Sequence, residues 1–593
     1  MSNISDNITY FDACCYIGRH VHKPDGQPET TEEILAEMNH FGIHEALVID
    51  VLSRETNPMA GNERIIQRTK NHPRLHPAWA GLMTHSRELP PPRELVARME
   101  ELGVGALFLF YGQFDIRLDD WGVDDLLEAL QELRVPVFLC PNNWREPGRI
   151  DLTDWSNVVR ICRKFPELPV IVTENRTYKS QRAGYAALEA CPNLKFDLSS
   201  WWLHRRIEFI CGEFGAERLV WGSQLPERNP GVPMMQLNYS DISPQELSLI
   251  AGGNMRNLLS WNKNIKFVND QATLSEPIDS LHRAARERLS LKDEKFYDCH
   301  GHIGWCTPHH VVVHPHLLPS PQAGERSGVR PFFKGEENIA EDLVREMDKF
   351  GIQVCCVFSL EGIFSDETYG NDVVAAVVKK YPDRFIGFTL LNPNHGERLM
   401  RKEMERGLEM GMRGIKLISA YHGYPTEGPL IDVACEFAHQ HGQFILNHHW
   451  GSPQQIERLC KTYPNACFFT GHANAEYGEV TKRVDNLFIC TCPFLSWGQT
   501  EQFVKIYGSD RILFGSDLTD LPIAWGLAPI FYAKIPEADK CKILGENLKA
   551  LMNQKLPEQI DVFVGGRDSY HFISSMSLTD GNSVKQTMHH FDD

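Results

Sequence analysis

Histidines and one aspartate recur in the second part of this 593-residue chain, each directly after a short apolar run. His300 and His302 stand two residues apart in "FYDCHGHIGWC", so both imidazoles would face the same side of a strand. His472 follows "ACFFTG", and Asp517 follows "RILFGS". Two or three imidazoles with one carboxylate suit a zinc ion, with manganese or iron as alternatives. An ion with an open position would lower the pKa of bound water towards neutrality.

Other residues could complete this site or bind a substrate. Adjacent His448 and His449 end the run "ILNHHWG", and the spacing leaves open which of them takes part. Lys416 in "RGIKLIS" is as suited to binding a substrate carboxylate as to a structural role. A long segment, 305–338, contains Arg326 and Arg330, whose guanidinium groups are candidates for binding a substrate carboxylate.

These candidates end apolar runs that alternate with amphipathic stretches. This alternation predicts parallel strands joined by crossover helices. Eight such units in about 260 residues fit a β/α barrel, in which the active site lies at the carboxyl ends of the strands. An open doubly wound sheet is the competing fold, but no glycine-rich dinucleotide turn follows the first strand. The eight runs are "KFYDC", "QVCCVFS", "FIGFTLL", "RGIKLIS", "QFILNH", "ACFFTG", "LFICTC" and "RILFGS".

The chain also repeats itself once, in order along its length. "EMDKFGI" (346–352) matches "EMNHFGI" (37–43), and "RILFGSDL" (511–518) matches "RLVWGSQL" (218–225). The fold prediction is therefore α/β with two tandem (β/α)8 TIM barrels. The predicted boundaries are a first barrel over 1–262, a linker over 263–293, a second barrel over 294–556 and a C-terminal extension over 557–593.

The first copy lacks the candidate ligands. Asn and Gln amides are poor zinc ligands, and one Cys with one Tyr does not rebuild a four-ligand site. We therefore expect the first barrel to be structural or regulatory and the activity to reside in the second. In the overlay Cys14 and Tyr16 replace His300 and His302, Asn142 and Asn143 replace His448 and His449, Leu107 replaces Lys416, Glu174 or Asn175 replaces His472, and Gln224 replaces Asp517.

Composition narrows the class of partner. A net charge of −18 disfavours nucleic acid and anionic membranes, which need a basic surface. No apolar run approaches the length of a membrane span, no signal peptide is apparent, and the 16 cysteines are scattered rather than spaced as a disulfide framework. We expect a cytoplasmic protein that acts on a small molecule, with an internal pseudo-dimer of barrels that could oligomerise further.

The sequence resembles the metal-dependent amidohydrolase superfamily, in its amidohydrolase-2 (aminocarboxymuconate semialdehyde decarboxylase-like) branch. The resemblance rests on "DCHGH", "HWG", "GHAN", "RILFGSD" and "ILGEN". It implies barrels of the amidohydrolase type and one divalent ion, usually zinc. The implied ligands are His300, His302, His449 and Asp517, with His448 as the alternate and otherwise a substrate-binding residue. His472 is implied as a catalytic acid/base or a polariser of the substrate.

The leading hypothesis is a metal-dependent hydrolase of an amide, lactone or related carbonyl compound that carries a carboxylate. Asp517 would take a proton from the attacking water and pass it to the leaving group, while His472 polarises the carbonyl. The first alternative is a metal-dependent non-oxidative decarboxylase, a lyase, with the same ligands. The second alternative is a non-catalytic binding protein, which predicts no stoichiometric metal.

Overall fold

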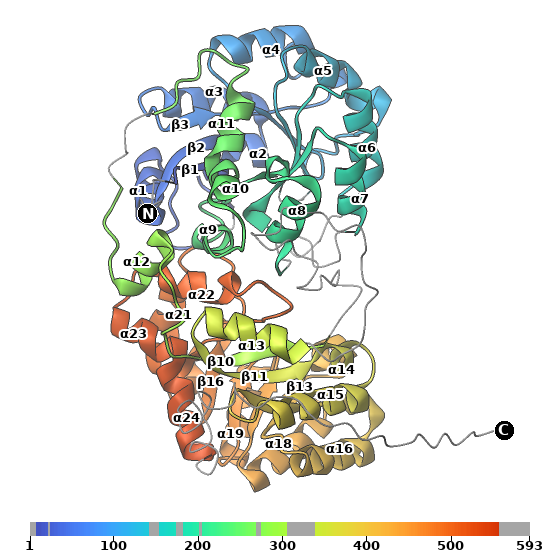
Figure 1. Ribbon diagram of the computed structural model, residues 1–593, viewed down its shortest axis with the longest axis vertical. Helices are drawn as coiled ribbons and strands as arrows, with labels where there is room; N and C mark the ends of the chain where they lie inside the picture. Colours follow the sequence, from blue (N-terminus) through green and yellow to red (C-terminus); the bar gives the residue numbers. More distant parts are fainter. Residues whose placement is uncertain are drawn as a thin grey trace, which may run out of the picture.

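The computed structural model describes residues 8–21, 24–141, 153–173, 182–200, 204–268, 274–304 and 339–556. We call residues 8–268 the N-terminal half and residues 294–556 the C-terminal half. Figure 1 shows the N-terminal half, in blue to green, above the C-terminal half, in yellow to red. In both halves parallel strands alternate with helices along the chain, so the predicted α/β class is confirmed.

The C-terminal half contains a nearly closed barrel of eight parallel strands, paired in chain order. Its two ends meet where Cys299 N donates to Phe514 O at 2.8 Å and Asp517 N donates to His300 O at 2.9 Å. The barrel predicted for this half is therefore confirmed. Its strands are β10 (Phe296–Ile303), β11 (Ile352–Ser359), β12 (Phe385–Leu391), β13 (Gly414–Leu417), β14 (Phe444–Asn447), β15 (Cys467–Thr470), β16 (Leu487–Cys490) and β17 (Ile512–Leu513).

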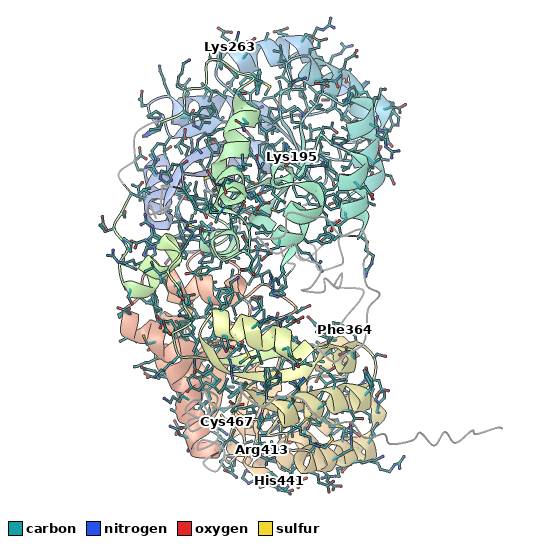
Figure 2. All side chains as sticks on the ribbon, viewed as in Figure 1. Lys195, Lys263, Phe364, Arg413, His441 and Cys467 are labelled. Carbon is teal, nitrogen blue, oxygen red and sulfur yellow. The ribbon has the colours of Figure 1, made fainter. Side chains whose placement is uncertain are left out.

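Helices surround this barrel, and several of them bury one apolar face. On α19, for example, Ser452 caps the first turn, Pro453 occupies the first helical position, and Ile456 and Leu459 are buried. Figure 2 shows buried Cys467 on β15 and exposed His441 at the end of α18, near the lower edge of the molecule. The helices are α13 (Ile339–Lys349), α14 (Leu360–Phe364), α15 (Glu367–Lys380), α16 (Glu397–Glu409), α17 (Ser419–His422), α18 (Leu430–His441), α19 (Pro453–Thr462), α20 (Gly478–Thr481), α21 (Gln499–Tyr507), α22 (Ala524–Phe531), α23 (Glu537–Cys541) and α24 (Asn547–Lys555).

The N-terminal half has two parallel sheets, also paired in chain order. Ala78 alone separates β3 from β4, and Ala13 N donates to Trp221 O at 2.9 Å, which links the first strand to the segment after the last. A second complete barrel stays a prediction. The sheets are β1 (Tyr10–Ile17), β2 (Ile43–Asp50) and β3 (Leu75–Pro77), then β4 (Trp79–Ala80), β5 (Leu107–Phe110), β6 (Val137–Cys140), β7 (Val170–Val172), β8 (Leu194–Asp197) and β9 (Leu219–Val220).

Helices of the N-terminal half follow its strands in the same alternation. On α1, Thr30 and Glu33 form a reciprocal capping box, and Gly42 ends the helix in the left-handed region at φ 84°. The helices are α1 (Thr31–Phe41), α2 (Val51–Glu55), α3 (Pro58–Thr69), α4 (Pro92–Glu101), α5 (Asp120–Glu132), α6 (Trp155–Lys164), α7 (Arg182–Ala190), α8 (Arg206–Phe214), α9 (Gly231–Asn238), α10 (Pro244–Ser248) and α11 (Asn254–Leu259).

Both halves repeat the same irregular geometry after their last strand. Gln224 and Asp517 both adopt a left-handed backbone, at φ 56° and 59°. A short π-helix follows in each half, η4 (Leu249–Gly253) and η10 (Lys542–Glu546). Asn254 then donates to the carbonyls of Ala216 and Leu219, as Asn547 does to those of Ser509 and Ile512.

Between the halves, α12 (Ser280–Glu287) lies in the predicted linker. In the part of the chain that the structure describes, no helix is long and apolar enough to cross a membrane. The described cysteines are free, which fits their prediction as thiols rather than as a disulfide framework. The predicted C-terminal extension and the segment 305–338 lie outside the described residues.

Candidate metal centre

Strand β10 presents two imidazoles to the carboxylate that follows β17. His302 Nε2 donates a hydrogen bond to Asp517 Oδ1 at 2.7 Å, and His300 Nε2 lies 3.3 Å from the same oxygen. The backbone beneath them is held by Asp298, whose carboxylate accepts from His300 N and Ser516 N. One buried carboxylate therefore fixes the spacing between the strand that carries the imidazoles and the loop that carries Asp517.

His448 and His449 take different directions after β14. The His448 ring lies 5.8 Å from that of His300 and stacks on His472 at 4.1 Å between centroids. The Nδ1 of His449 accepts a hydrogen bond from Gly451 N instead, and its ring lies 6.0 Å from Tyr477. The structure thus brings His448, the alternate, to the cluster, and it does not bring His449 there.

The strand alternation explains this difference. Phe444 and Leu446 of β14 belong to the core inside the barrel, together with Phe358 and Phe388 of neighbouring strands. Because successive side chains on a strand point to opposite faces, the next inward position is 448 and not 449. Counting from the apolar residues of "FILNHH" would have selected His448 from the sequence.

Lys416 of β13 lies at the floor of the same cluster. It is fully buried, its Nζ lies 3.9 Å from the centroid of the Phe358 ring, and that nitrogen has no hydrogen-bond partner in the part of the chain that the structure describes. Burial lowers the pKa of Lys416 to about 7, against the attraction of Asp517. Such a buried amine can bind an anionic group of a ligand without first breaking a hydrogen bond within the protein.

Burial favours neutral imidazoles at His300, His448 and His472, whereas Asp517 is held in its ionised form. Burial lowers the pKa of His300 to about 4, aided by the charge of Lys416. Burial also lowers the pKa of His448 and of His472. Asp517 is the opposite case, because the hydrogen bond and charge of His302 outweigh burial and hold its pKa well below the usual range. Neutral imidazole and ionised carboxylate are the forms that bind metal.

A divalent ion fits these donors. Among the described residues, buried His300 Nε2, His302 Nδ1 and both ring nitrogens of His448 have no hydrogen-bond partner, although buried polar atoms are normally paired. His300, Cys492 and Asp517 each offer one ligand atom, and these three atoms lie within 4.8 Å of one another. Orphaned nitrogens around a carboxylate are expected where a cation completes the site. Cys492 is a member of this group that the sequence reasoning did not single out.

Two of the predicted substrate-binding residues, Arg326 and Arg330, lie outside the described residues. The positions that match His448, His449 and His472 in the N-terminal half, 142, 143 and 174–175, also lie outside them.

At the matched positions that the structure describes, the N-terminal half has an internally paired network. Cys14 Sγ lies 3.1 Å from Tyr16 Oη, and the Arg54 guanidinium covers the Tyr16 ring at 4.1 Å. Arg54 also pairs with Glu227, which in turn pairs with His20. Burial would raise the pKa of Glu227, but the charges of Arg54 and His20 hold it well below the usual range. The carboxylate of this network is thus neutralised by protein cations.

One protein family matches most of this chain. A family model described as amidohydrolase matches residues 24–261 and 363–551. Three solved structures are similar in fold: an uncharacterised TIM-barrel protein from Bordetella bronchiseptica (18% identity, 43% of this chain and 99% of that one, TM-score 0.34), 2,6-dihydroxybenzoate decarboxylase from Rhizobium (16%, 44% and 99%, 0.32), and 5-carboxyvanillate decarboxylase from Novosphingobium aromaticivorans in complex with manganese (15%, 44% and 96%, 0.32). No curated protein matches the chain.

Proposed function

Because this chain belongs to the amidohydrolase family, we propose that its C-terminal half is a metal-dependent hydrolase of an amide, lactone or related carbonyl compound that carries a carboxylate. The observation that carries the proposal is the convergence of His300, His302, His448 and Asp517 at the carboxyl ends of three strands. In this proposal these four residues hold one divalent ion, zinc in the first instance, with manganese or iron as alternatives. When bound, the ion would activate a water molecule and polarise the substrate carbonyl.

Asp517 is the proposed proton carrier. Its carboxylate is ionised and lies 2.7 Å from His302 Nε2, so one oxygen can be engaged while the other accepts a proton from the attacking water. The protonated carboxyl would then donate that proton to the leaving group. His472 lies above His448 at the end of β15 and would donate a hydrogen bond to the carbonyl oxygen as negative charge develops.

Lys416 is the proposed partner of the substrate carboxylate. Its Nζ is buried without a hydrogen-bond partner among the described residues, and the charge that most raises its pKa is that of Asp517. A bound carboxylate would restore the protonated lysine by direct pairing. Arg326 and Arg330 are proposed to guide the same group towards the site.

Non-oxidative decarboxylation is the second candidate, favoured by the depth of the site. His300 and Lys416 are fully buried and Asp517 is 7% exposed, and a water-poor site favours the loss of charge when a carboxylate departs as carbon dioxide. The proton for the resulting carbanion would come from Asp517 or His472. This candidate uses the same ligands, so the two must be separated by their products.

The test is a product assay on the full chain loaded with zinc or manganese. Carboxylated aromatics and a set of lactones and amides would each be incubated with the protein, and carbon dioxide release would be compared with ring or amide opening. Opening without carbon dioxide supports the hydrolase, and the reverse supports the decarboxylase. A protein that holds no stoichiometric metal, and is unchanged by His300→Ala, would instead be the non-catalytic binding protein.

The N-terminal half is proposed to be a degenerate second copy that forms an internal pseudo-dimer with the C-terminal half. Two matched contacts support this. The ring centroid of Tyr532, which follows α22, lies 5.0 Å from that of Phe41 across the boundary between the halves. The ring centroid of Tyr239, which follows α9, lies 5.5 Å from that of Phe350. Tyr532 matches Tyr239, and Phe41 matches Phe350, so the same pair of positions meets twice with the two halves exchanged, as in an isologous interface.

Polar contacts across the boundary also involve matching positions of the two halves. Trp497 Nε1 of the C-terminal half donates to Glu37 Oε2 on α1 at 2.9 Å, and Arg205 Nη1 of the N-terminal half lies 3.3 Å from Glu346 Oε1 on α13. Glu37 and Glu346 occupy the same position in the repeated "EM" motif. Expression of residues 290–593 alone tests the role of this interface: a stable and fully active fragment would remove any need for the N-terminal half. The cytoplasm stays the proposed compartment.

A further inference from the structure

Cys492 is placed at the metal centre by the close approach of three strand ends. It follows β16, it is fully buried, and its Sγ lies within 4.8 Å of the ligand atoms of His300 and Asp517. Gly515 permits this approach, since a Cβ atom at that position would lie 2.9 Å from His300 Cβ and 3.2 Å from Cys492 Cβ. A side chain at 515 would therefore separate Cys492 from His300.

Burial alone does not distinguish Cys492, because nearly all the described cysteines are buried. The alternation of β16 does distinguish it, since Phe488 and Cys490 lie in the core inside the barrel and position 492 continues their side. Cys490 Sγ accepts a hydrogen bond from Cys492 N at 3.3 Å and lies 3.9 Å from His300 Nδ1, the ring nitrogen opposite the one that faces Asp517. Cys490 therefore lies near the Nδ1 side of the His300 ring, away from Asp517, whereas Cys492 lies near Asp517.

We propose that Cys492 is a further, thiolate ligand of the metal, beside His300, His302, His448 and Asp517, and that it makes the site prefer zinc to manganese. The inference rests on the proposed metal site of the C-terminal half. Two donors bound to one zinc ion lie roughly 3.5 Å apart, so these three atoms, which lie within 4.8 Å of one another, would approach by about 1 Å on binding it. On binding, a sulfur–metal bond forms and the thiol proton is released to solvent.

The expected consequence is a change in metal selectivity. Thiolate is a soft donor that suits zinc and cobalt, whereas manganese is best held by oxygen ligands and imidazole. A site with one sulfur donor should therefore bind zinc more tightly, relative to manganese, than the same site with serine at position 492.

The experiment loads the full chain with Co²⁺ after removal of metal, and compares wild type, Cys492→Ser and the matched control Cys490→Ser. We expect about one cobalt per chain and a sulfur-to-cobalt charge-transfer band in the near ultraviolet for wild type and Cys490→Ser. Cys492→Ser should lose the band, and its preference for zinc over manganese should fall by at least about tenfold.

X-ray absorption of zinc-loaded wild type provides a measurement that needs no variant, and one sulfur neighbour at about 2.3 Å is expected. Stoichiometric metal without the band or the sulfur neighbour would overturn the role of Cys492 and leave the proposed metal site standing. Loss of the band in Cys490→Ser alone would also overturn it. A wild-type chain that binds no cobalt would overturn both proposals together.

Discussion

At the residue scale, the direction in which a side chain points after the end of a strand decides which polar groups can react together. His448 and His449 are neighbours in sequence, yet one stacks on His472 and the other faces Tyr477. The same alternation places Cys492 beside Asp517 and Cys490 behind His300. Chemistry in this chain therefore depends on single-residue register at each strand end, which residue type alone does not specify.

The pair of adjacent histidines supplies a matched test of the metal site. We expect His448→Ala to weaken zinc binding by more than about 100-fold, because it removes a direct ligand, whereas effects of outer residues are typically smaller. His449→Ala should leave zinc affinity nearly unchanged, since its Nδ1 accepts a hydrogen bond from Gly451 N and its ring lies near Tyr477 rather than in the cluster. Competition titration with a chelating dye measures both affinities. Equal losses in the two variants would contradict the assignment of His448.

At the element scale, each half joins its first strand to its last by one buried aspartate. Asp298 accepts hydrogen bonds from His300 N and Ser516 N, and Asp12 accepts from Cys14 N and Ser223 N. The two carboxylates are equivalent in the structure, but only the first lies beneath the candidate metal ligands. Substitution of each aspartate in turn therefore separates two roles, the joining of the first and last strands and the support of the metal site.

Asp298→Ala and Asp12→Ala should each lower the free energy of unfolding by about 2 to 4 kcal/mol, because two buried N–H groups lose their acceptor. Chemical denaturation of the metal-free chain measures this loss. Only Asp298→Ala should also weaken zinc binding, since it releases the backbone of His300 and Ser516. If Asp12→Ala reduced zinc affinity to the same extent, the two halves would be coupled more tightly than this geometry implies.

At the scale of the whole molecule, a pair of buried histidines near the linker joins the halves. His40 Nε2 donates to Tyr532 O at 2.8 Å, and His282 of α12 donates from Nε2 to His40 O at 3.1 Å. His282 Nδ1 accepts from Ile278 N, so this ring must be neutral to make both of its bonds. The hydrogen bonds at this contact between the halves therefore require a neutral His282 imidazole.

Stability should therefore depend on pH through these rings. Burial, then the charges of His40 and Arg286, lower the pKa of His282 from 6.5 to about 3. A depressed folded pKa means that the neutral form stabilises the fold fully above about pH 6.5, and that this contribution is lost as pH falls towards 3. The free energy of unfolding should therefore fall by up to about 1.4 kcal/mol for each pH step of one within this window.

Thermal unfolding between pH 7 and pH 4 checks this dependence. We expect the melting temperature of wild type to fall more steeply than that of His282→Gln, because glutamine can donate and accept the same bonds without titrating. Parallel curves for the two proteins would show that His282 does not carry the acid sensitivity. Lys534 and Lys540 also face His40 and are present in both proteins, so they cancel in the comparison.

The sequence by itself determined the alternation of strands and helices, the repeat, and the strand ends that carry His300, His302, His472 and Asp517, because these depend on periodicity and on order along the chain. The choice of His448 over His449 follows from the alternation of β14, which the sequence contains but which its motifs alone did not reveal. The sequence did not determine the place of Cys492 or the rings that join the halves, because these depend on contacts between segments hundreds of residues apart. Only closure of the barrel brings the ends of β10, β16 and β17 close enough for their side chains to bind one ion. Only the packing of the two halves selects which side chains meet across the interface between them.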